Sequence, residues 1–406
     1  MRAALAVIAT SALALAACAP NPEVFDRLAT PEPPAQSPTE TASASTESRP
    51  SSPATSASAA AGRECRDAAA DLTLQEQVGQ LFMVGVSTAG LDQTTRSAIS
   101  NGRIGSVVLL ENSTDGSAPI RRLTAELGSL GTAKAPLLVA VDQEGGSVQR
   151  LKGEGFSQMP PAREQGQMAD GELREAAASW GEELRAAGVH YNLAPVADVV
   201  PEHKRGSNAP IGQLKREYGS DAESATRSVV EFVEGMEEAG VATSLKHFPG
   251  LGEVETNTDF GAAEDADTEA DGPGIRPFTA GIEAGADSVM VSSAVFTKID
   301  PDNEGVFSSK VIGDLLRGEL GFDGVVIADD LGAAKSVRDI APADRALRFI
   351  DAGGDLLINA DPKIMGEMVE ATLEKAQSDG AFAERLLDST GRVLRLKASV
   401  GLVDCQ

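Results

Sequence analysis

The chain has 406 residues, with 61 acidic and 35 basic side chains and a formal net charge of -26. A field of this sign repels phosphate backbones, and no basic stripe is interleaved with aromatic residues, so we do not expect a nucleic acid partner. Hydrophobic residues make up 42% of the chain, which is enough for a sizeable core in one large domain or two ordinary ones.

The first 17 residues have the features of an export signal. Arg2 supplies a positive start, and an apolar run rich in Ala, Leu and Val follows. The run is short for a spanning helix, which needs about 20 apolar residues. It ends in "LAAC" at Leu15–Cys18, and small residues before a cysteine resemble the lipobox of bacterial lipoproteins. We therefore expect lipidation at Cys18 and anchoring to the outer face of the cell membrane, with an ordinary signal peptide and an incidental cysteine as the alternative.

The next segment, residues 18–62, is rich in Pro, Ser, Thr and Ala. Its apolar content is too low to offset the entropy of ordering, so it predicts a disordered tether. Cys65 and Cys405 bracket the remaining region, residues 63–406. In an exported protein an even pair of cysteines favours a disulfide, and two free thiols are the alternative.

From residue 66 onward, short apolar runs alternate with amphipathic helical stretches. The runs are rich in Val, Ile or Leu and too short for buried helices, so they predict strands. These runs span residues 80–86, 106–111, 137–143, 190–196, 242–248, 288–295, 325–330 and 355–360.

One junction recurs along this region: a helical stretch closes on a glycine, and a strand begins within a few residues. Gly188, Gly240, Gly285 and Gly353 occupy this position. Glycine past a helix end adopts the left-handed conformation that other residues resist, so the repeat indicates parallel βα units. Eight such strands predict a single (β/α)8 barrel over residues 63–406, with closing helices at its end. An open doubly wound sheet is the alternative, but no G-x-G-x-x-G opens its first helix.

Polar residues follow several of these strands, at the end of a barrel where chemistry takes place. Asp142 and Glu144 follow the third strand, Lys246 and His247 end the fifth, and Ser292 and Ser293 end the sixth. No histidine or cysteine cluster has metal-ligand spacing, so we expect no metal and no other cofactor.

The seventh strand ends in two carboxylates, Asp329 and Asp330. Buried carboxylates are costly unless they are paired or functional. Side chains alternate along a strand, so the two cannot share a face. One can therefore cap the next helix, as Asp330 would, while the other points into the site.

Five motifs together resemble glycoside hydrolase family 3, and in particular its single-barrel β-N-acetylhexosaminidases. They appear in the order and spacing of that family and cover essentially all of residues 70–400. The motifs are "VDQEGGSVQRL", "LAPVADV", "LKHFPGLG", "GFDGVVIADDL" and "DAGGDLLINA".

The resemblance implies a retaining double displacement on β-linked N-acetylglucosamine, especially in cell-wall glycans. It implies that Asp329 is the nucleophile and that charged residues bind the sugar hydroxyls. Those residues are Asp142, Arg216, Lys246 and His247. The match is looser around Arg216, where "IGQLKREYG" replaces the family's G-x-R-S-F-G, and Lys215 is a competitor.

The loop after "KHFPG" departs from the family pattern. The family places an Asp and, two residues later, an acid/base His in this loop; here these positions hold Asn257 and Asp259. Leu251 also replaces a usual His. A direct carboxylic acid/base at Asp259 is chemically sensible, because carboxylate pairs are the general solution in glycosidases. Donation by Glu253 or Glu255 and a catalytically impaired, glycan-binding domain are the alternatives.

The leading hypothesis is thus a membrane-anchored exo-β-N-acetylglucosaminidase acting on peptidoglycan fragments as a monomer. A surface lipoprotein that binds such fragments without turnover is the second hypothesis. The third is a β-glucosidase of the same family, although most of those carry a second α/β domain after the barrel. Chromogenic aryl glycosides distinguish the three.

Overall fold

The structure is a computed structural model that describes residues 53–405, with side chains from residue 62 onward. The predicted signal, the lipidation at Cys18 and the tether up to residue 52 lie outside the described residues. Among those that are described, no helix combines the length and apolar character needed to cross a membrane.

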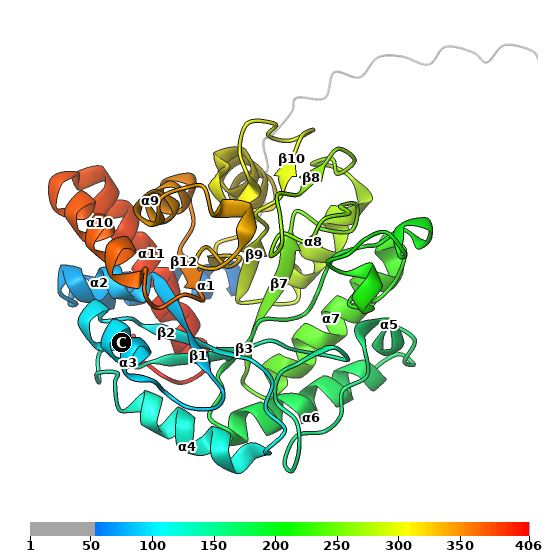
Figure 1. Cartoon of the computed structure of the whole chain (residues 1–406), viewed down its shortest axis with the longest axis horizontal. Coiled ribbons are helices and arrows are strands. Elements are labelled where there is room, and N and C mark those ends of the chain that lie inside the picture. The colour runs from blue at the N-terminus through cyan, green and yellow to red at the C-terminus, as the bar shows by residue number, and fades with distance from the viewer. Residues whose placement is uncertain (1–52, 406) are drawn as a thin grey trace, which may run out of the picture. The chain divides into compact units, whose positions relative to one another are not determined.

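Eight parallel strands close into a barrel, and the helices surround it (Figure 1). This confirms the (β/α)8 fold and all eight predicted strands. The strands, in the order in which they pair around the ring, are β1 (Phe82–Ser87), β2 (Ser106–Leu110), β3 (Leu138–Val141), β6 (Tyr191–Asn192), β7 (Ala242–Phe248), β9 (Ser288–Val291), β11 (Val325–Ala328) and β12 (Leu356–Asn359).

The helices between and after these strands complete the βα repeat. The α-helices are α1 (Pro53–Ala70), α2 (Leu74–Gln80), α3 (Gln93–Gly102), α4 (Ser117–Gly128), α5 (Ala162–Gln165), α6 (Glu172–Ala186), α7 (Ala222–Glu238), α8 (Arg276–Glu283), α9 (Pro342–Ala352), α10 (Met365–Ser378) and α11 (Gly380–Ser399). A π-helix, η5 (Lys310–Glu319), fills the place between β9 and β11. The glycines at the four predicted junctions all have positive φ, between 69° and 112°, which explains why glycine stands there.

Short helical turns and strand pairs lie within the loops. Three-residue 3-10 turns are η1 (Glu202–Lys204), η2 (Gly212–Leu214), η3 (Pro273–Ile275), η4 (Gly305–Phe307) and η6 (Lys335–Val337). Two small strand pairs are β4 (Gln143–Gly145) with β5 (Val148–Gln149), and β8 (Glu264–Asp265) with β10 (Val295–Phe296).

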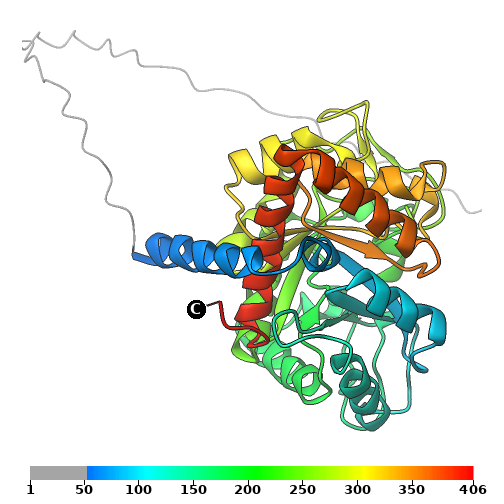
Figure 2. The same ribbon diagram turned by 90° about the vertical axis from the view of Figure 1, so that its left-hand side faces the viewer.

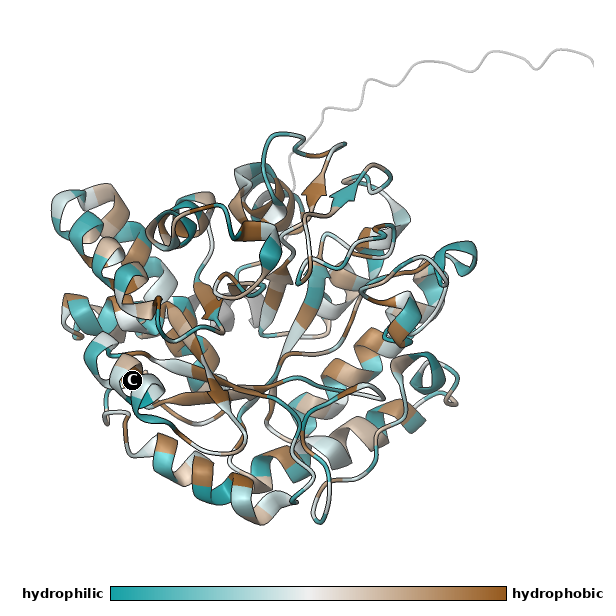
Figure 3. Cartoon of the chain, viewed as in Figure 1, coloured by the Kyte–Doolittle hydropathy of each residue, from teal (hydrophilic) through white to brown (hydrophobic). Residues whose placement is uncertain are grey.

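The core has two layers separated by the sheet. The larger cluster lies between the strands and the helices, and a smaller one fills the barrel interior. Figure 3 shows the result as helices that mix hydrophilic and hydrophobic segments around largely hydrophobic strands. Val393, Leu396 and Val400, from α11 and the residue after it, belong to the interior cluster. Lys397 of the same helix donates to the carbonyls of Gly105 and Pro136, at the starts of β2 and β3. Helix α11 therefore closes the N-terminal end of the barrel, and the opposite end is left for chemistry.

Helix α1 corrects one predicted boundary. We expected a disordered tether through residue 62, but α1 begins at Pro53. The stretch is rich in alanine, the strongest helix former, and the helix continues into residues held by tertiary contacts. Arg66 pairs with Glu384 and Asp388 of α11 at 2.7 and 2.6 Å. Figure 2 shows α1 crossing beside α11.

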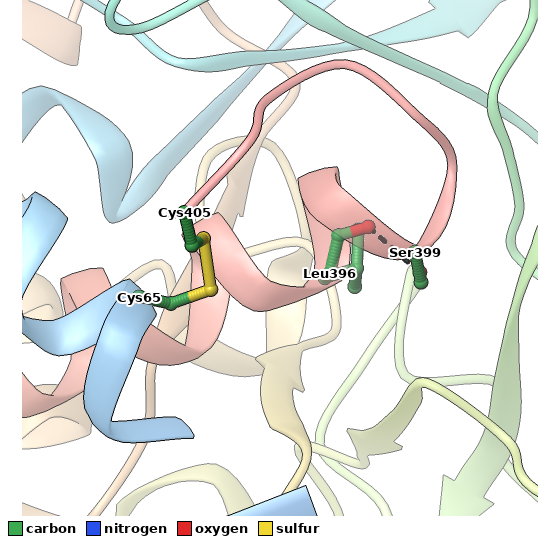
Figure 4. The surroundings of a disulfide bond; sticks show 4 residues. All are labelled: Cys65, Leu396, Ser399 and Cys405. Atoms are coloured by element: carbon green, nitrogen blue, oxygen red, sulfur yellow. Dashed lines mark hydrogen bonds between the residues drawn. A yellow bond between two sulfur atoms is a disulfide. The ribbon is translucent and has the colours of Figure 1, made fainter. Parts of the chain in front are cut away.

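A disulfide joins Cys65 of α1 to Cys405, with a Cα–Cα distance of 4.7 Å (Figure 4). The last turn of α11 lies beside it, where the Ser399 hydroxyl donates to the Leu396 carbonyl at 2.9 Å. The bond closes a loop with a sequence separation of 340 residues. In the chain-entropy model such a loop stabilises the fold by on the order of 5 kcal/mol.

Candidate active site

The candidate site lies at the C-terminal ends of the barrel strands. Lys246 and His247 lie near the end of β7, directly before its last residue, and Asp329 follows directly after β11. Asp142 follows directly after β3, and Arg216 comes from the loop between β6 and α7. Since all these strands are parallel, their ends meet at one mouth of the barrel.

A buried ion network joins three of the predicted sugar-binding residues. The Lys246 ammonium, which is 2% exposed, donates to Asp142 Oδ1 at 2.7 Å and lies 2.6 Å from Glu144 Oε1. The Arg216 guanidinium makes a bidentate pair with the same Glu144, with both bonds at 2.8 Å. Asp142, Lys246 and Arg216 are thus brought together through Glu144.

Glu144 is a residue whose role our sequence prediction missed. Burial alone would raise the pKa of its carboxyl, but Arg216 and Lys246 outweigh burial and hold this pKa far below its ordinary value of 4.5. The carboxylate therefore remains ionised and fixes two cations at the mouth of the barrel. Its position in the "DQEGG" motif was visible, but its two partners could not be inferred from spacing.

His247 is oriented by Asp198, a second residue that the prediction missed. The His247 Nδ1 atom lies 2.8 Å from Asp198 Oδ2, and the His247 backbone N–H donates to Asp198 Oδ1 at 3.1 Å. The N–H of Leu251 donates to the same oxygen at 2.7 Å. The other ring nitrogen, Nε2, lies 3.5 Å from Arg216 Nη2. The one sequence signal for Asp198 was a lone carboxylate in the apolar run "LAPVADV".

The two aspartates after β11 have different surroundings. Both carboxylate oxygens of Asp330 accept backbone N–H groups, from Gly332 and Ala360 at Oδ1 and from Ala333 at Oδ2, at 2.8 to 2.9 Å. Asp330 therefore caps a turn and ties it to the end of β12, rather than capping helix α9. Asp329 Oδ1 accepts the N–H of Asp330 at 2.9 Å, and among the described residues nothing donates to its Oδ2. One oxygen of Asp329 is thus free to react.

The loop that carries Asp259 is held against the loop after β11. The backbone N–H groups of Lys335 and Ser336 donate to the carbonyls of Asp259 and Thr258, at 3.3 and 3.2 Å. The Asn257 side chain accepts the N–H of Asp259 at 2.9 Å, so the residue at the family's Asp position shapes the turn that presents Asp259. Asp259 and Asp329 are therefore carried by two adjoining loops.

The two carboxyls influence one another. Burial raises the pKa of Asp329 above 3.8; His247 opposes this rise, and the charge of Asp259 adds to it. The side chain of Asp259 reaches solvent, yet the protein around it raises the pKa of this carboxyl too, against the opposing charges of His247 and Arg216. Together the two groups retain a proton more readily than isolated aspartates would, which is the arrangement that acid/base chemistry needs.

The alternative residues from the sequence analysis lie elsewhere. Glu253 forms an ion pair with Lys204 at 2.7 Å, and Glu255 is exposed. Lys215 is exposed and has a left-handed backbone, with φ of 57°. Leu251, in place of the usual His, is buried in a small hydrophobic cluster. Across residues 62–405 there is no group of His, Cys, Asp and Glu that could hold a metal ion.

The mouth of this barrel presents two interacting carboxyls beside a network of charged side chains. This is the architecture of a glycoside hydrolase. Comparison with known families agrees, since residues 73–396 match the glycosyl hydrolase family 3 N-terminal domain. The chain belongs to glycoside hydrolase family 3.

Relatives within this family give a consistent picture. A beta-hexosaminidase of Stenotrophomonas maltophilia is 34% identical over 311 residues, which cover 74% of this chain and 90% of the relative. The crystal structure of a beta-N-acetylhexosaminidase from Beutenbergia cavernae is 47% identical, with a TM-score of 0.79, and covers 81% of this chain and 99% of that one. A family 3 beta-N-acetylglucosaminidase from Paenibacillus is 32% identical, with a TM-score of 0.75, and covers 82% and 63%.

Proposed function

We propose that this protein is an exo-acting β-N-acetylglucosaminidase that retains the anomeric configuration. The observation that carries the proposal is the free Oδ2 of Asp329, together with the electrostatic influence on this carboxyl of a second carboxyl of raised pKa, Asp259. The names of its relatives, beta-hexosaminidase and beta-N-acetylglucosaminidase, support the choice of sugar.

In the first step, Asp329 Oδ2 attacks the anomeric carbon while the bond from that carbon to the glycosidic oxygen breaks. Asp259 gives its proton to the departing oxygen, which leaves as an alcohol. The product is an ester between Asp329 and the sugar. In the second step, Asp259, now a carboxylate, takes a proton from water as that water attacks the same carbon. Asp329 leaves as a carboxylate, and two inversions give net retention.

The charged network supplies partners for the sugar hydroxyls. Lys246 uses two of its N–H bonds on Asp142 and Glu144, which leaves one to donate to substrate. Asp142 keeps Oδ2 as an acceptor. Asp198 holds His247 so that Nε2 is presented beside Arg216. Charged groups bond hydroxyls more strongly than neutral ones do, so a small number of them can position a single terminal sugar.

The experiment is hydrolysis of a chromogenic aryl β-N-acetylglucosaminide by the protein from residue 53. Wild type should turn over, and Asp329→Asn should reduce the rate by at least 10⁴-fold, as expected for loss of a nucleophile that acts with a partner. The matched control is Asp330→Asn. Its carboxylate caps a turn, so this variant should lose thermal stability and keep turnover. Equal rates for Asp329→Asn and wild type would refute the proposal.

A non-catalytic glycan-binding protein is the second candidate, because Asn257 and Asp259 stand where the family has its Asp and His. It predicts that N-acetylglucosamine fragments raise the melting temperature while no aryl glycoside is cleaved. The β-glucosidase alternative predicts faster cleavage of an aryl glucoside than of the matching N-acetylglucosaminide. Turnover of the N-acetylglucosaminide that depends on Asp329 excludes the first alternative, and faster cleavage of the N-acetylglucosaminide than of the glucoside excludes the second.

We also propose that the natural substrates are peptidoglycan fragments and that the enzyme is a monomer anchored at the cell surface through Cys18. The support for the anchor is the signal-like sequence that ends at this residue. Labelling of cells with a fatty acid should mark wild type and not Cys18→Ser. Sedimentation of the protein from residue 53 tests the monomer.

A further inference from the structure

The buried side chain of Asn208 contacts both the loop that carries Asp259 and the loop that carries Arg216. This residue precedes η2 in the loop after β6 and is 1% exposed. No role has been assigned to it so far. Its amide lies between the loop of the proposed proton donor, Asp259, and the loop of a proposed sugar ligand, Arg216.

All the bonding capacity of the Asn208 amide is used in this position. Its Nδ2 donates to the carbonyls of Leu251, Val254 and Gly252, at 2.7, 2.8 and 3.1 Å. Its Oδ1 accepts the N–H groups of Ile211 and Gly212, at 3.0 and 2.7 Å. One end of the amide therefore holds the root of the Asp259 loop, and the other end holds the turn that leads to Arg216.

The chemistry of this position selects an amide. A carboxylate would accept the two N–H groups but would place a negative oxygen against three carbonyls. An aliphatic side chain would leave five buried backbone groups without their partner, and such groups are costly when they are desolvated. Asparagine provides a donor and an acceptor on opposite sides of one plane, which matches the two segments.

The root of the loop has little freedom to take another path. Leu251 and Val254 are buried in the cluster that also contains Ile211. Gly252 lies so close to the Val199 carbonyl that a Cβ would come within 1.7 Å of its oxygen. The tip is held separately by the bonds from Lys335 and Ser336 to Asp259 and Thr258. Asn208 therefore fixes the root, together with Asp198 at the Leu251 N–H, and the tip contacts hold the backbone of Asp259.

We infer that Asn208 is a positioning residue for proton donation: it aligns the Asp259 loop with the Arg216 loop, so that the donor meets the glycosidic oxygen of a bound sugar. The inference rests on the proposed function. Its signature is selective, because a misplaced donor slows only reactions that need a proton on the leaving group. A 2,4-dinitrophenyl leaving group departs as a stable anion and needs no proton, whereas a phenyl or sugar leaving group does.

The test compares kcat/KM for 2,4-dinitrophenyl and phenyl β-N-acetylglucosaminides, since this constant reports the steps up to the covalent intermediate. Three variants are measured beside wild type: Asn208→Asp, Asn208→Ala, and Asp259→Asn as the reference for complete loss of the donor. Thr124→Val is the control. It removes a buried hydroxyl that donates to the Ala187 carbonyl on the outer helices at 2.8 Å, and it reports general destabilisation.

The ratio of interest is kcat/KM for the dinitrophenyl substrate divided by kcat/KM for the phenyl substrate. We expect this ratio to rise at least 10-fold in both Asn208 variants, as it should in Asp259→Asn. The rise should come from a large loss of kcat/KM for the phenyl substrate and a smaller loss for the dinitrophenyl substrate. Thr124→Val should leave the ratio unchanged. If Asp259→Asn shifts the ratio and the Asn208 variants do not, the inference fails while the proposed donor stands. If Asp259→Asn itself leaves the ratio unchanged, the proposed donor fails. Should Asn208→Asp not fold, Asn208→Ala decides the matter, because it introduces no charge.

Discussion

Replacement of Glu144 by glutamine is the perturbation whose size can be worked out most completely from the structure. The carboxylate is 4% exposed and receives three bonds from cations, one from Lys246 at 2.6 Å and two from Arg216 at 2.8 Å. Glutamine has nearly the same shape but keeps a single acceptor oxygen, so at least one cation faces an NH₂ group. Breaking a buried charge pair on one side costs about 3 to 5 kcal/mol.

We therefore expect Glu144→Gln to lower the free energy of unfolding at pH 7 by about 3 to 5 kcal/mol. This corresponds to a fall of roughly 4 to 7 °C in melting temperature for a domain of this size. Lys246 and Arg216 would also shift at the site, and displacements of this kind cost on the order of 10²-fold in kcat/KM. Glu269→Gln is the control, since the surface pair that it breaks with Lys298 should contribute less than about 1 kcal/mol.

The pH dependence provides a sharper check on the same variant. Because the pKa of Glu144 is depressed in the folded protein, the stability that it contributes is complete above its ordinary pKa of 4.5 and is lost as pH falls below this value. The difference in unfolding free energy between wild type and Glu144→Gln should thus shrink between pH 4.5 and pH 3. Denaturant titrations across this range measure it. A difference that is negligible at pH 7, or that is the same at every pH, would show that Glu144 is not an ionised anchor of the two cations.

Three further predictions concern the two carboxyls and the disulfide. Asp259→Asn removes the charge that raises the pKa of Asp329, so the acidic limb of kcat/KM for the dinitrophenyl substrate should move to lower pH; a limb that stays in place would show that the two carboxyls do not interact. Asp329→Asn should stabilise the free protein at pH 7 by about 1 kcal/mol, because a carboxyl whose pKa is raised in the folded state destabilises the fold once it is ionised. This gain in stability should vanish below pH 3.8. Calorimetry of wild type and the variant at pH 7 and below pH 3.8 measures it. Cys405→Ser should lower the melting temperature under non-reducing conditions and leave kcat unchanged, since the disulfide lies at the closed end of the barrel; a loss of kcat at a temperature where the variant is folded would contradict that placement.

The barrel could be predicted because its signals are local. Each strand is a short apolar run, and glycines such as Gly188 and Gly240 mark the point where a helix ends and the next strand begins. These features depend on neighbouring residues, so spacing alone reveals them. The N-terminal helix was missed for the opposite reason. An alanine-rich segment suits both a helix and a disordered chain, and the contacts of Arg66 with α11, more than 300 residues away, favour the helix.

The candidate site was predictable as a set of residues but not as a network. Motif positions predicted that Asp142, Lys246 and Asp329 belong to the site. Glu144 and Asp198 gained their importance from partners that lie far along the chain, with Arg216 72 residues from Glu144 and His247 49 residues from Asp198. Such pairs depend on how the strand ends meet around the ring.

The candidate proton donor could be named from the sequence, but its surroundings could not be predicted. The motif position favours Asp259 over Glu253 and Glu255, although all three follow the "KHFPG" motif on one loop. Folding pairs Glu253 with Lys204 and leaves Glu255 exposed. The contacts from Lys335 and Ser336 then hold Asp259 on the side of Asp329. These contacts join loops that follow different strands, and no local pattern encodes them.

Azide rescue tests most directly whether Asp329 and Asp259 act as the nucleophile and the acid/base of a retaining mechanism, as we propose. In Asp259→Ala, 2,4-dinitrophenyl β-N-acetylglucosaminide should still load Asp329, but water would attack the intermediate slowly without a base. Azide needs no base and should fit the space left by the missing carboxyl. We predict that added azide accelerates turnover of Asp259→Ala, but not of wild type, and that nuclear magnetic resonance identifies the product as β-N-acetylglucosaminyl azide. An α-azide, or no response to azide, would contradict the assigned pair.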